Sequence, residues 1–383
     1  MTHDAFLSEP PSPNLFSFQK LGLFKGHFET IQKFIRATYD LRDSKNYQKK
    51  VLGHETTQKN KSVLMSFDFH IADDSIKLIE INTNASHFMT SYLMSDFVLQ
   101  DQLPIADSLQ DLQQSFLKEW GLFSGGSKKL SHICIVDEDP KTQRSYFEFL
   151  IYKRFFEDLG YSCTIEDYRN ITIQNHALCD SQGKPIDLVY NRHTDFLFDH
   201  SPTLRQAYIE KLACISPHPE EYLLLADKNR LMQFSDSQFL KEFLKPEQLQ
   251  LFEAIVPKIF EVNSKAKEEI WSLRKQYFFK PKNAFGGKGV FRGDALRHKA
   301  FDELYASGNY LAQELAPANE IKIQDQVSHW VNAKWDLRVY VYDGGIQHLT
   351  ARAFVGQTTN FRTLGGGHVA VFLSENKLIG SKI

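Results

Sequence analysis

An acid and an amide stand two residues apart in a segment that otherwise predicts a buried strand. The segment KLIEINTNAS, residues 77–86, carries Glu80 and Asn82, and side chains two apart on a strand share one face. The preceding SVLMSFDFHI also predicts a strand, and the intervening ADDS has the composition of a hairpin turn. With the tip of the hairpin near Asp74, the residue numbers of two paired residues add up to about 148, so Asp68 is expected opposite Glu80. The pattern therefore predicts three oxygen-bearing side chains on one face of a hairpin.

Two carboxylates and an amide oxygen are suitable ligands for a hard cation. Magnesium prefers oxygen ligands and keeps positions open for water and phosphate. The same pattern is also typical of the solvated polar face of an edge hairpin, and the spacing alone does not decide between the two. We therefore take Asp68, Glu80 and Asn82 as candidate magnesium ligands.

A glycine-rich segment forms the second candidate cluster. YFFKPKNAFGGKGVF predicts a strand ending at Lys280, a loop with Gly286, Gly287 and Gly289, and a further strand. Glycines let backbone N–H groups approach phosphate oxygens, and a lysine adds positive charge. The segment is neither a P-loop, because the GK[ST] ending is absent, nor a GxGxxG turn that opens a helix. It indicates either a phosphate-binding lid or a hairpin without a ligand.

Further charged or polar side chains stand beside predicted strands or at the start of a predicted helix. The segments are LLLADKNRLM, YLAQELAP, KWDLRVYVYDGGIQHLTARAFV and TTNFRTLGGGHVAVF, and the residues are Lys228, Gln313, Glu314, Arg338, Arg352 and Arg362. Taken singly, such a lysine is more often a solvated helix residue, and such arginines are more often exposed on a sheet.

The order of these segments resembles that of the ATP-grasp ligases, in which two α+β lobes hold ATP between them. The superfamily usually closes with an aspartate strand and an E-x-N strand, whereas here these come first, as Asp68 and Glu80-x-Asn82. That order resembles the circularly permuted branch, the eukaryotic-type glutathione synthetases and the glutathionylspermidine synthetases. EINTNAS is similar to the EINT-S-S run of glutathione synthetase. VYNRHTDF is similar to the segment whose arginine, here Arg192, holds substrate, and the resemblance covers about residues 60–383.

Two departures from the family pattern bear on function. Relatives usually carry an arginine two residues before the metal aspartate, where it stabilises transition-state charge, and this chain has Ser66 there. Glutathione synthetase also has an acidic metal ligand in its glycine-rich loop, and the matching place here is near Ala284. The first departure concerns catalytic competence or the identity of the charge stabiliser. The second argues against a plain glutathione synthetase.

The resemblance implies an ATP- and Mg²⁺-dependent carboxylate–amine ligase that forms an amide or peptide bond through an acyl phosphate. It implies catalytic roles for Arg362, Lys280 and Arg338. It implies ATP binding by Lys228, Lys280, Gly286, Gly287, Gly289, Gln313 and Glu314, the last two largely through their backbone as an adenine hinge. Substrate binding falls to Arg192, Ser86 and Arg352, and metal binding to Asp68, Glu80 and Asn82. The alternatives are a non-catalytic nucleotide-binding or regulatory protein and a phosphoryl transferase on the same fold.

The composition of the 383-residue chain excludes several classes of partner. Its formal net charge of −2 provides no basic field for nucleic acid, and no apolar run is long enough to span a bilayer. The N-terminal MTHDAFLSEPPSP has no signal-peptide core, and the four cysteines form no CxxC pair. We therefore expect a cytoplasmic protein with small-molecule carboxylate and amine substrates, without nucleic-acid or membrane partners, and a homodimer is left open.

The predicted elements divide the chain into three parts. Residues 1–125 are expected to hold N-terminal helices plus the metal-ligand hairpin, which joins the ATP-grasp core. A strand–helix–strand order predicts an α/β substrate-binding domain over residues 130–215. Residues 216–383 are expected to form the ATP-grasp lobes with the glycine-rich lid. The resemblance implies the fold class, α+β or α/β: a circularly permuted ATP-grasp fold with an additional α/β substrate domain.

Overall fold

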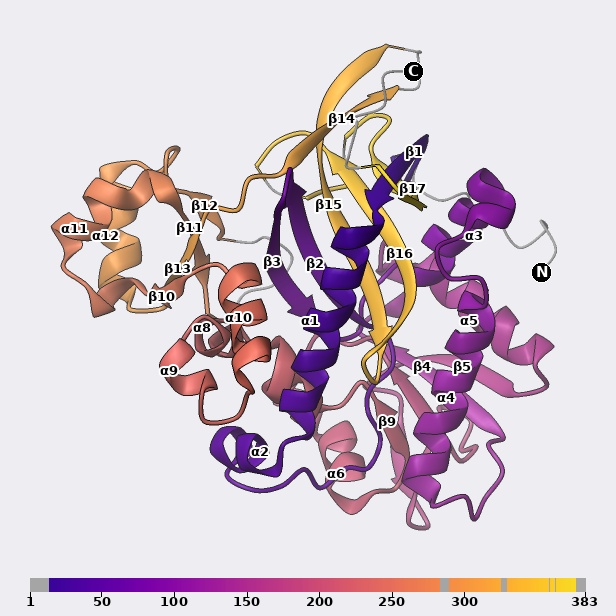
Figure 1. Ribbon diagram of the computed structural model, residues 1–383. Helices are drawn as coiled ribbons and strands as arrows, with labels where there is room; N and C mark the ends of the chain where they lie inside the picture. The colour runs from indigo at the N-terminus through magenta and orange to yellow at the C-terminus, as the bar shows by residue number, and fades with distance from the viewer. Residues whose placement is uncertain (1–13, 283–288, 325–328, 358, 362, 377–383) are drawn as a thin grey trace.

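A long mixed sheet forms the centre of the computed structural model, which describes residues 14–282, 289–324, 329–357, 359–361 and 363–376 (Figure 1). Its strands follow the order β1-β17-β16-β15-β2-β3, and β14 pairs with part of β15. Only the β1–β17 pair among them is parallel. The strand bounds are β1 Phe16–Phe24, β17 Gly367–Ser374, β16 Gly345–Phe354, β15 Trp330–Tyr342, β2 Met65–Ala72, β3 Ser75–Asn82 and β14 Asn319–Gln324.

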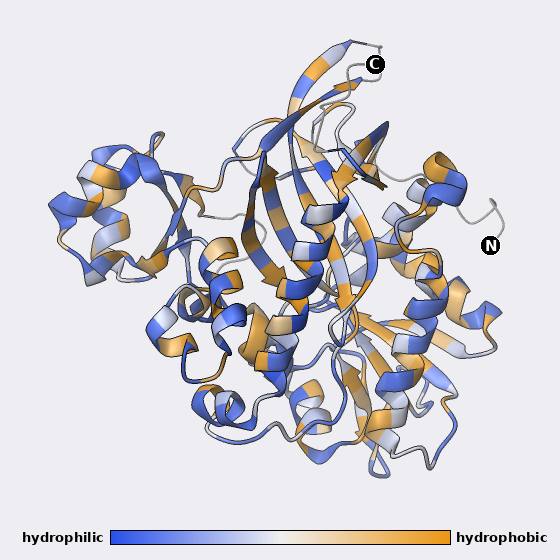
Figure 2. Ribbon diagram, viewed as in Figure 1, coloured by the Kyte–Doolittle hydropathy of each residue, from blue (hydrophilic) through white to orange (hydrophobic). Residues whose placement is uncertain are grey.

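Side-chain alternation gives the central sheet one apolar and one polar face. Phe67, Phe69 and Leu337 lie on the side of helix α1 (Lys25–Asp43), while Asp68 and Arg338 lie on the other. Figure 2 shows orange and blue segments alternating along β2 and β3. The sequence pattern of period two therefore places the polar side chains away from the main core.

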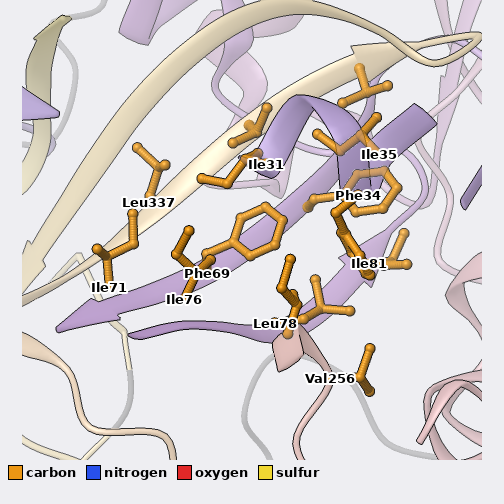
Figure 3. Packing of buried hydrophobic residues seen from close by; sticks show 14 of the residues in the cluster. Ile31, Phe34, Ile35, Phe69, Ile71, Ile76, Leu78, Ile81, Val256 and Leu337 are labelled. Atoms are coloured by element: carbon orange, nitrogen blue, oxygen red, sulfur yellow. The ribbon is translucent and has the colours of Figure 1, made fainter. Parts of the chain in front are cut away.

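Helix α1 covers the apolar face with a stripe of aromatic and branched residues. The ring of Phe34 lies 6.1 Å from that of Phe69 and 4.9 Å from that of Phe252 on α10 (Pro246–Ile255). Figure 3 shows Ile31, Phe34 and Ile35 of α1 facing the hairpin strands. Burying each such side chain stabilises the fold by about 1.5–3 kcal/mol. This packing fixes the hairpin from behind.

A parallel sheet with helices on both faces forms a second unit. Its order is β5-β4-β8-β9, with β5 Ser162–Asp167, β4 His132–Asp137, β8 Leu188–Asn191 and β9 Cys214–Ser216. Ile133 and Ile135 face the core that contains α4 (Ser108–Ser124) and α5 (Tyr146–Asp158). Cys134 and Val136 face the core under α6 (Pro202–Glu210). Helix α3 (Phe88–Leu99) connects the hairpin to this unit.

A small lobe lies beside the hairpin, on the left of Figure 1. Its antiparallel sheet runs β10-β13-β11-β12, and its core holds Phe279, Phe301 and Ile270. The bounds are β10 Ile259–Glu261, β13 Tyr310–Glu314, β11 Tyr277–Pro281 and β12 Phe291–Arg292, with helices α11 Lys267–Leu273 and α12 His298–Ser307.

The remaining elements are short. They are α2 Lys45–Leu52, α7 Pro219–Glu221, a π-helical turn η4 Tyr222–Ala226, α8 Lys228–Phe234, α9 Ser237–Leu240, the strands β6 Thr172–Gln174 and β7 Ala177–Cys179, and the 3₁₀ turns η2 Gln100–Gln102, η3 Pro140–Thr142, η5 Val262–Ser264 and η6 Arg274–Gln276. Within the described part of the chain, no helix combines the length and apolar character needed to cross a membrane.

The first described strand, which precedes helices α1 and α2, was not among the predicted elements. Residues 16–24 form β1, which pairs in parallel with β17 at the edge of the central sheet. The strand carries no clean alternation, because Phe18 is exposed while Leu21 and Leu23 are buried. Its partner lies about 350 residues further along the chain, so the pairing has no local sequence signal.

Candidate functional site

A cavity of about 460 Å³ is lined by residues from the central sheet, the sheet of the small lobe, the loop after β3, and the segment around η4. Among its lining residues are predicted site residues from each part of the sequence, namely Glu80, Asn82, Ser86, Lys228, Lys280, Gln313, Glu314, Arg338 and Arg352. The structure therefore brings together side chains that are up to 272 positions apart in the chain, from residue 80 to residue 352.

The hairpin has the predicted register where the polar residues stand. Asp68 lies opposite Glu80, and Ser66 lies opposite Asn82. The register shifts by one between Asp68 and Phe69, so that Phe69 pairs with Leu78 and Ile79 becomes the extra residue of a bulge. The carbonyl of Ile79 accepts hydrogen bonds of 3.4 Å from Lys280 Nζ and from Gln313 Nε2. The bulge thus joins the central sheet to the small lobe at the cavity.

The carboxylate of Asp68 is completely buried and is held by two arginines. Arg338 donates from Nε to Oδ1 at 2.8 Å and from Nη2 to Oδ2 at 2.7 Å, and Arg352 donates from Nη2 to Oδ2 at 2.9 Å. Burial raises the pKa of Asp68, but the two guanidinium groups outweigh it and bring that pKa to about 2. Asp68 is therefore a fixed anion at neutral pH.

The arginines are buried members of a charge network. Each is 8% exposed, so the interpretation of Arg338 and Arg352 as exposed sheet residues is wrong. Arg352 also donates to both carboxylate oxygens of Asp336, at 2.6 and 3.0 Å, and the hydroxyl of Thr359 donates to the same carboxylate. Asp336 lines the cavity and was not among the predicted site residues. Its two-residue spacing from Arg338 is the signal that would have placed it on the same face.

Glu80 and Asn82 complete the predicted set of ligands at the cavity wall. Asn82 Nδ2 donates to Asp68 Oδ2 at 3.2 Å and to Glu80 Oε1 at 3.3 Å. Among the described residues, Asp68 Oδ2 thus accepts three N–H groups, and the N–H group that Oδ1 accepts comes from Arg338. Glu80 and Asn82 line the cavity and Asp68 does not, so the oxygens that would hold Mg²⁺ at the wall are those of Glu80 and Asn82.

Two lysines approach the same cavity from the small lobe and from α8. Lys280 lies on β11, and Lys228, the first residue of α8, donates to the carbonyl of Pro281 at 2.6 Å. Burial, and the positive charge of Lys280, lower the pKa of Lys228 to about 8. Burial also lowers the pKa of Lys280, and Glu80 opposes that shift. Two partly desolvated cations at one wall would be stabilised by an anionic ligand.

The π-helical turn η4 forms the part of the cavity wall that precedes Lys228 in the chain. Tyr222 and Ala226, at its two ends, both line the cavity, and Lys228 follows two residues later. Phe196 stacks on Tyr222 with ring centroids 4.6 Å apart and also lines the cavity. Such turns are often found at functional sites, because they re-aim side chains that a regular helix would bury.

The role of Gln313 and Glu314 as an adenine hinge stays a prediction. Gln313 and Glu314 do line the cavity at the end of β13. However, the backbone N–H of Glu314 donates to Lys258 O at 2.9 Å, and that of Leu315 donates to Gln276 O at 2.8 Å. These two backbone donors are already used within the protein, so they do not serve a nucleotide in this structure.

Arg192 and Ser86 contact each other beside the cavity. Arg192 Nη2 donates to Ser86 Oγ at 2.7 Å, and Nη1 donates to the carbonyl of Asn84. Ser86 and Asn84 line the cavity, whereas Arg192 is buried behind them and does not appear among the lining residues. These hydrogen bonds of Arg192 hold the loop after β3. Its predicted contact with a substrate carboxylate stays a prediction.

The glycine-rich loop and the last arginine fall largely outside the described residues. Gly286, Gly287, Ala284 and Arg362 are in that undescribed set, so their predicted roles stay predictions. Gly289 is described and has a φ of +70°, the left-handed region that favours glycine. An added Cβ there would lie 3.3 Å from Pro281 Cγ and from the hydroxyl of Tyr310.

Ser66 lies at the place where relatives of the resembled family carry arginine. It is completely buried between Asn82 and Tyr340 in the sheet, and its hydroxyl has no hydrogen-bond partner among the described residues. The guanidinium groups beside Asp68 come instead from β15 and β16, through Arg338 and Arg352. Positive charge at this point is therefore present without an arginine at position 66.

Comparisons with known proteins identify the fold. Neither a family model nor a curated protein matches the chain. The apo form of a glutathione synthetase-like effector from Globodera pallida is similar in structure, with 14% identity, 94% of this chain and 90% of that chain covered, and a TM-score of 0.58. A protein from Methylobacillus flagellatus KT, provisionally named a gamma-glutamylcysteine synthetase, matches with 11% identity, 90% and 87% coverage, and a TM-score of 0.50.

The ATP-grasp ligase PsnB, complexed with a precursor variant, Mg and ADP, also matches over 63% of this chain and 88% of that one. Its 12% identity and TM-score of 0.30 are too low to bear on the fold. The first two likenesses confirm the predicted fold class in its coarser form. The chain has a mixed α/β architecture and shares its fold with the glutathione synthetase-like effector and with the Methylobacillus flagellatus protein.

Proposed function

We propose that the protein is an ATP-dependent carboxylate–amine ligase of the glutathione synthetase-like type, with a circularly permuted ATP-grasp order. The observation that carries this proposal is the cavity in which Lys228 and Lys280 face the Glu80-x-Asn82 strand. The fold likeness supports it. The permuted order is supported by hairpin strand β2, which precedes β15 by more than 250 residues and still pairs with it.

In the proposed reaction, a substrate carboxylate attacks the γ-phosphorus of ATP and ADP leaves. An amine then attacks the acyl carbon, phosphate leaves, and the amine loses a proton. Such catalysis depends on positioning and charge neutralisation. This chemistry needs cations and metal ligands rather than a side-chain nucleophile, and the cavity supplies those groups.

Each part of the cavity has a proposed role. Lys228 and Lys280 bind the phosphates, and Arg338 and Arg352 neutralise charge on the carboxylate and the transferred phosphoryl group. Glu80 and Asn82 would hold Mg²⁺, which would supply positive charge to neutralise the phosphates. Asp68 keeps both arginines in place through its buried ion pairs. We further propose that the substrates are small carboxylates and amines and that the protein acts in the cytoplasm.

A second candidate is a non-catalytic nucleotide-binding protein on the same fold, favoured by Ser66 in place of the family arginine. A third is a phosphoryl transferase. A screen of amino acids, dipeptides and polyamines with an ADP readout tests all three. The ligase predicts ADP release that requires an acid, and hydroxylamine should trap the acyl phosphate. ADP release without a hydroxamate product would favour the transferase, and nucleotide binding without turnover would favour the non-catalytic protein.

A further inference from the structure

The loop between β3 and α3, residues 83–87, forms one wall of the cavity. Hydrogen bonds with residues outside the loop hold it in place. The N–H of Ala85 donates to Leu64 O at 2.9 Å, and the hydroxyl of Tyr340 donates to Ser86 O at 2.6 Å. Arg192 donates to Asn84 O and to Ser86 Oγ. The loop begins directly after Asn82, so its conformation bears on the candidate metal ligands as well as on the wall.

The backbone of this loop adopts conformations that have to be maintained by its surroundings. Asn84 has a φ of +45° and His87 a φ of +72°, both in the left-handed region and neither a glycine. Such conformations are strained for residues other than glycine and persist where surrounding contacts determine them. The contacts that hold His87 are therefore decisive for the shape of the wall.

Glu148 on α5 holds His87 and the start of helix α3. Its Oε2 accepts the backbone N–H of His87 at 2.7 Å, and its Oε1 accepts that of Met89 at 3.2 Å. The 12-residue helix α3 has no hydrogen bond from the side chain at its own N-cap, His87. Glu148, which is 1% exposed, satisfies N–H groups that would otherwise be buried without partners.

Arg192 holds the other end of the loop from the same α/β unit. It carries the charge opposite to that of Glu148, and the two buried groups interact electrostatically. Among the described residues of that unit, only Thr194 and Phe196 line the cavity themselves. The α/β unit thus acts on the cavity mainly through Glu148 and Arg192, whose charged side chains form hydrogen bonds with the loop.

We propose that Glu148 is a positioning residue for the substrate end of the cavity: by accepting the N–H groups of His87 and Met89 it fixes the wall that carries Asn84 and Ser86. The expected effect of Glu148 on substrate binding rests on the proposed function. Its expected effect on the conformation of the loop rests on hydrogen-bond geometry alone. Glu148 touches neither the cavity nor the lysines, so the nucleotide end should not depend on it.

The test compares Glu148→Gln with a matched change on the same helix. Glutamine keeps the size but turns an N–H₂ donor toward backbone donors. Ile151→Val trims a buried side chain of α5 in the same core and has no bond to the loop, so it controls for loss of stability. Glu148→Asp keeps the charge with a shorter reach, and it serves if Glu148→Gln does not fold. Hydrogen exchange is measured on each full-length protein.

In Glu148→Gln, exchange at residues 84–90 should rise about tenfold or more relative to wild type. Exchange in β4 and β11 should stay within about twofold, and Ile151→Val should show no selective rise in the loop. Glu148→Asp should fall between Glu148→Gln and wild type. Unchanged exchange in the loop, or a rise that Ile151→Val reproduces, would overturn the proposal.

The kinetic readout separates positioning from a loss of folded protein. With the acid that supports most ADP release in the screen, Glu148→Gln should raise the KM for that acid about tenfold and leave the KM for ATP within about twofold. A fall in kcat with both KM values unchanged would overturn the positioning role. If wild type neither releases ADP nor binds it, the proposed function fails, and the exchange experiment still decides the structural claim.

Discussion

Removing the charge of Asp68 should destabilise the protein far more than removing that of Glu80, although the two residues lie opposite each other. Asp68 is 0% exposed and is the carboxylate to which Arg338 donates from both Nε and Nη2. Asp68→Asn would leave that guanidinium buried without an anion in contact. Breaking a buried ion pair on one side typically costs about 3–5 kcal/mol. Because Asp336 continues to neutralise Arg352, we expect the free energy of unfolding to fall by about 3 kcal/mol, the lower end of that range.

Glu80 is half-buried, and the hydrogen bond that it receives from Asn82 is long, at 3.3 Å. Glu80→Gln should therefore change the free energy of unfolding by less than about 1 kcal/mol. Urea unfolding followed by circular dichroism measures both variants, with an unchanged m value as the check on the comparison. Asp73→Asn, an exposed charge removal at the tip of the same hairpin, is the control. Equal losses for Asp68→Asn and Glu80→Gln would refute the reasoning.

Three further outcomes follow from the geometry. Burial raises the pKa of Asp68, but the two arginines outweigh burial and lower that pKa from 3.8 to about 2. The ionised form of Asp68 therefore stabilises the fold above pH 4. That contribution, about 2 kcal/mol, should be lost in urea titrations as the pH falls through 2, and Asp68→Asn should lack this dependence. Lys280→Ala should weaken ADP binding in calorimetry by about 1.5–3 kcal/mol, while the exposed Lys275→Ala should not. Gly293→Ala should lower the melting temperature, because its Cβ would lie 1.8 Å from the carbonyl oxygen of Arg274; an unchanged value would contradict that packing.

The hairpin was predictable because its information is local. Period-two alternation and the ADDS turn determine which residues pair, and Asp68 does lie opposite Glu80. The bulge at Ile79 was not predictable, because nothing in the alternation of KLIEIN marks an extra residue. Its position depends on contacts of the Ile79 carbonyl with Lys280 and Gln313 in another lobe.

The partners of Asp68 could not be derived from spacing. Arg338 and Arg352 stand 270 and 284 positions away, and they reach Asp68 because β2 pairs with β15 in the folded sheet. Single-strand patterns carry no information on such pairing. The resemblance placed both arginines in the site, but it did not indicate that they hold Asp68.

Strand β1 and Glu148 show two other limits of the sequence. β1 is an edge strand whose partner β17 lies near the other end of the chain, and its polar residues obscure the alternation. Glu148 lies in an apolar stretch of helix α5, where a single acid has no pattern that marks it as a cap for another helix. Both features depend on tertiary contacts.

The proposed function requires the cavity to bind a nucleotide through its lysines and through Mg²⁺ held by the hairpin. Calorimetric titration of wild type and Glu80→Gln with ADP, in the presence and absence of Mg²⁺, tests it most directly. We expect Mg²⁺ to tighten ADP binding by about tenfold or more in wild type, and Glu80→Gln to lose this enhancement while keeping its Mg²⁺-free affinity. Absence of ADP binding in wild type, or an enhancement by Mg²⁺ that survives in Glu80→Gln, would contradict it.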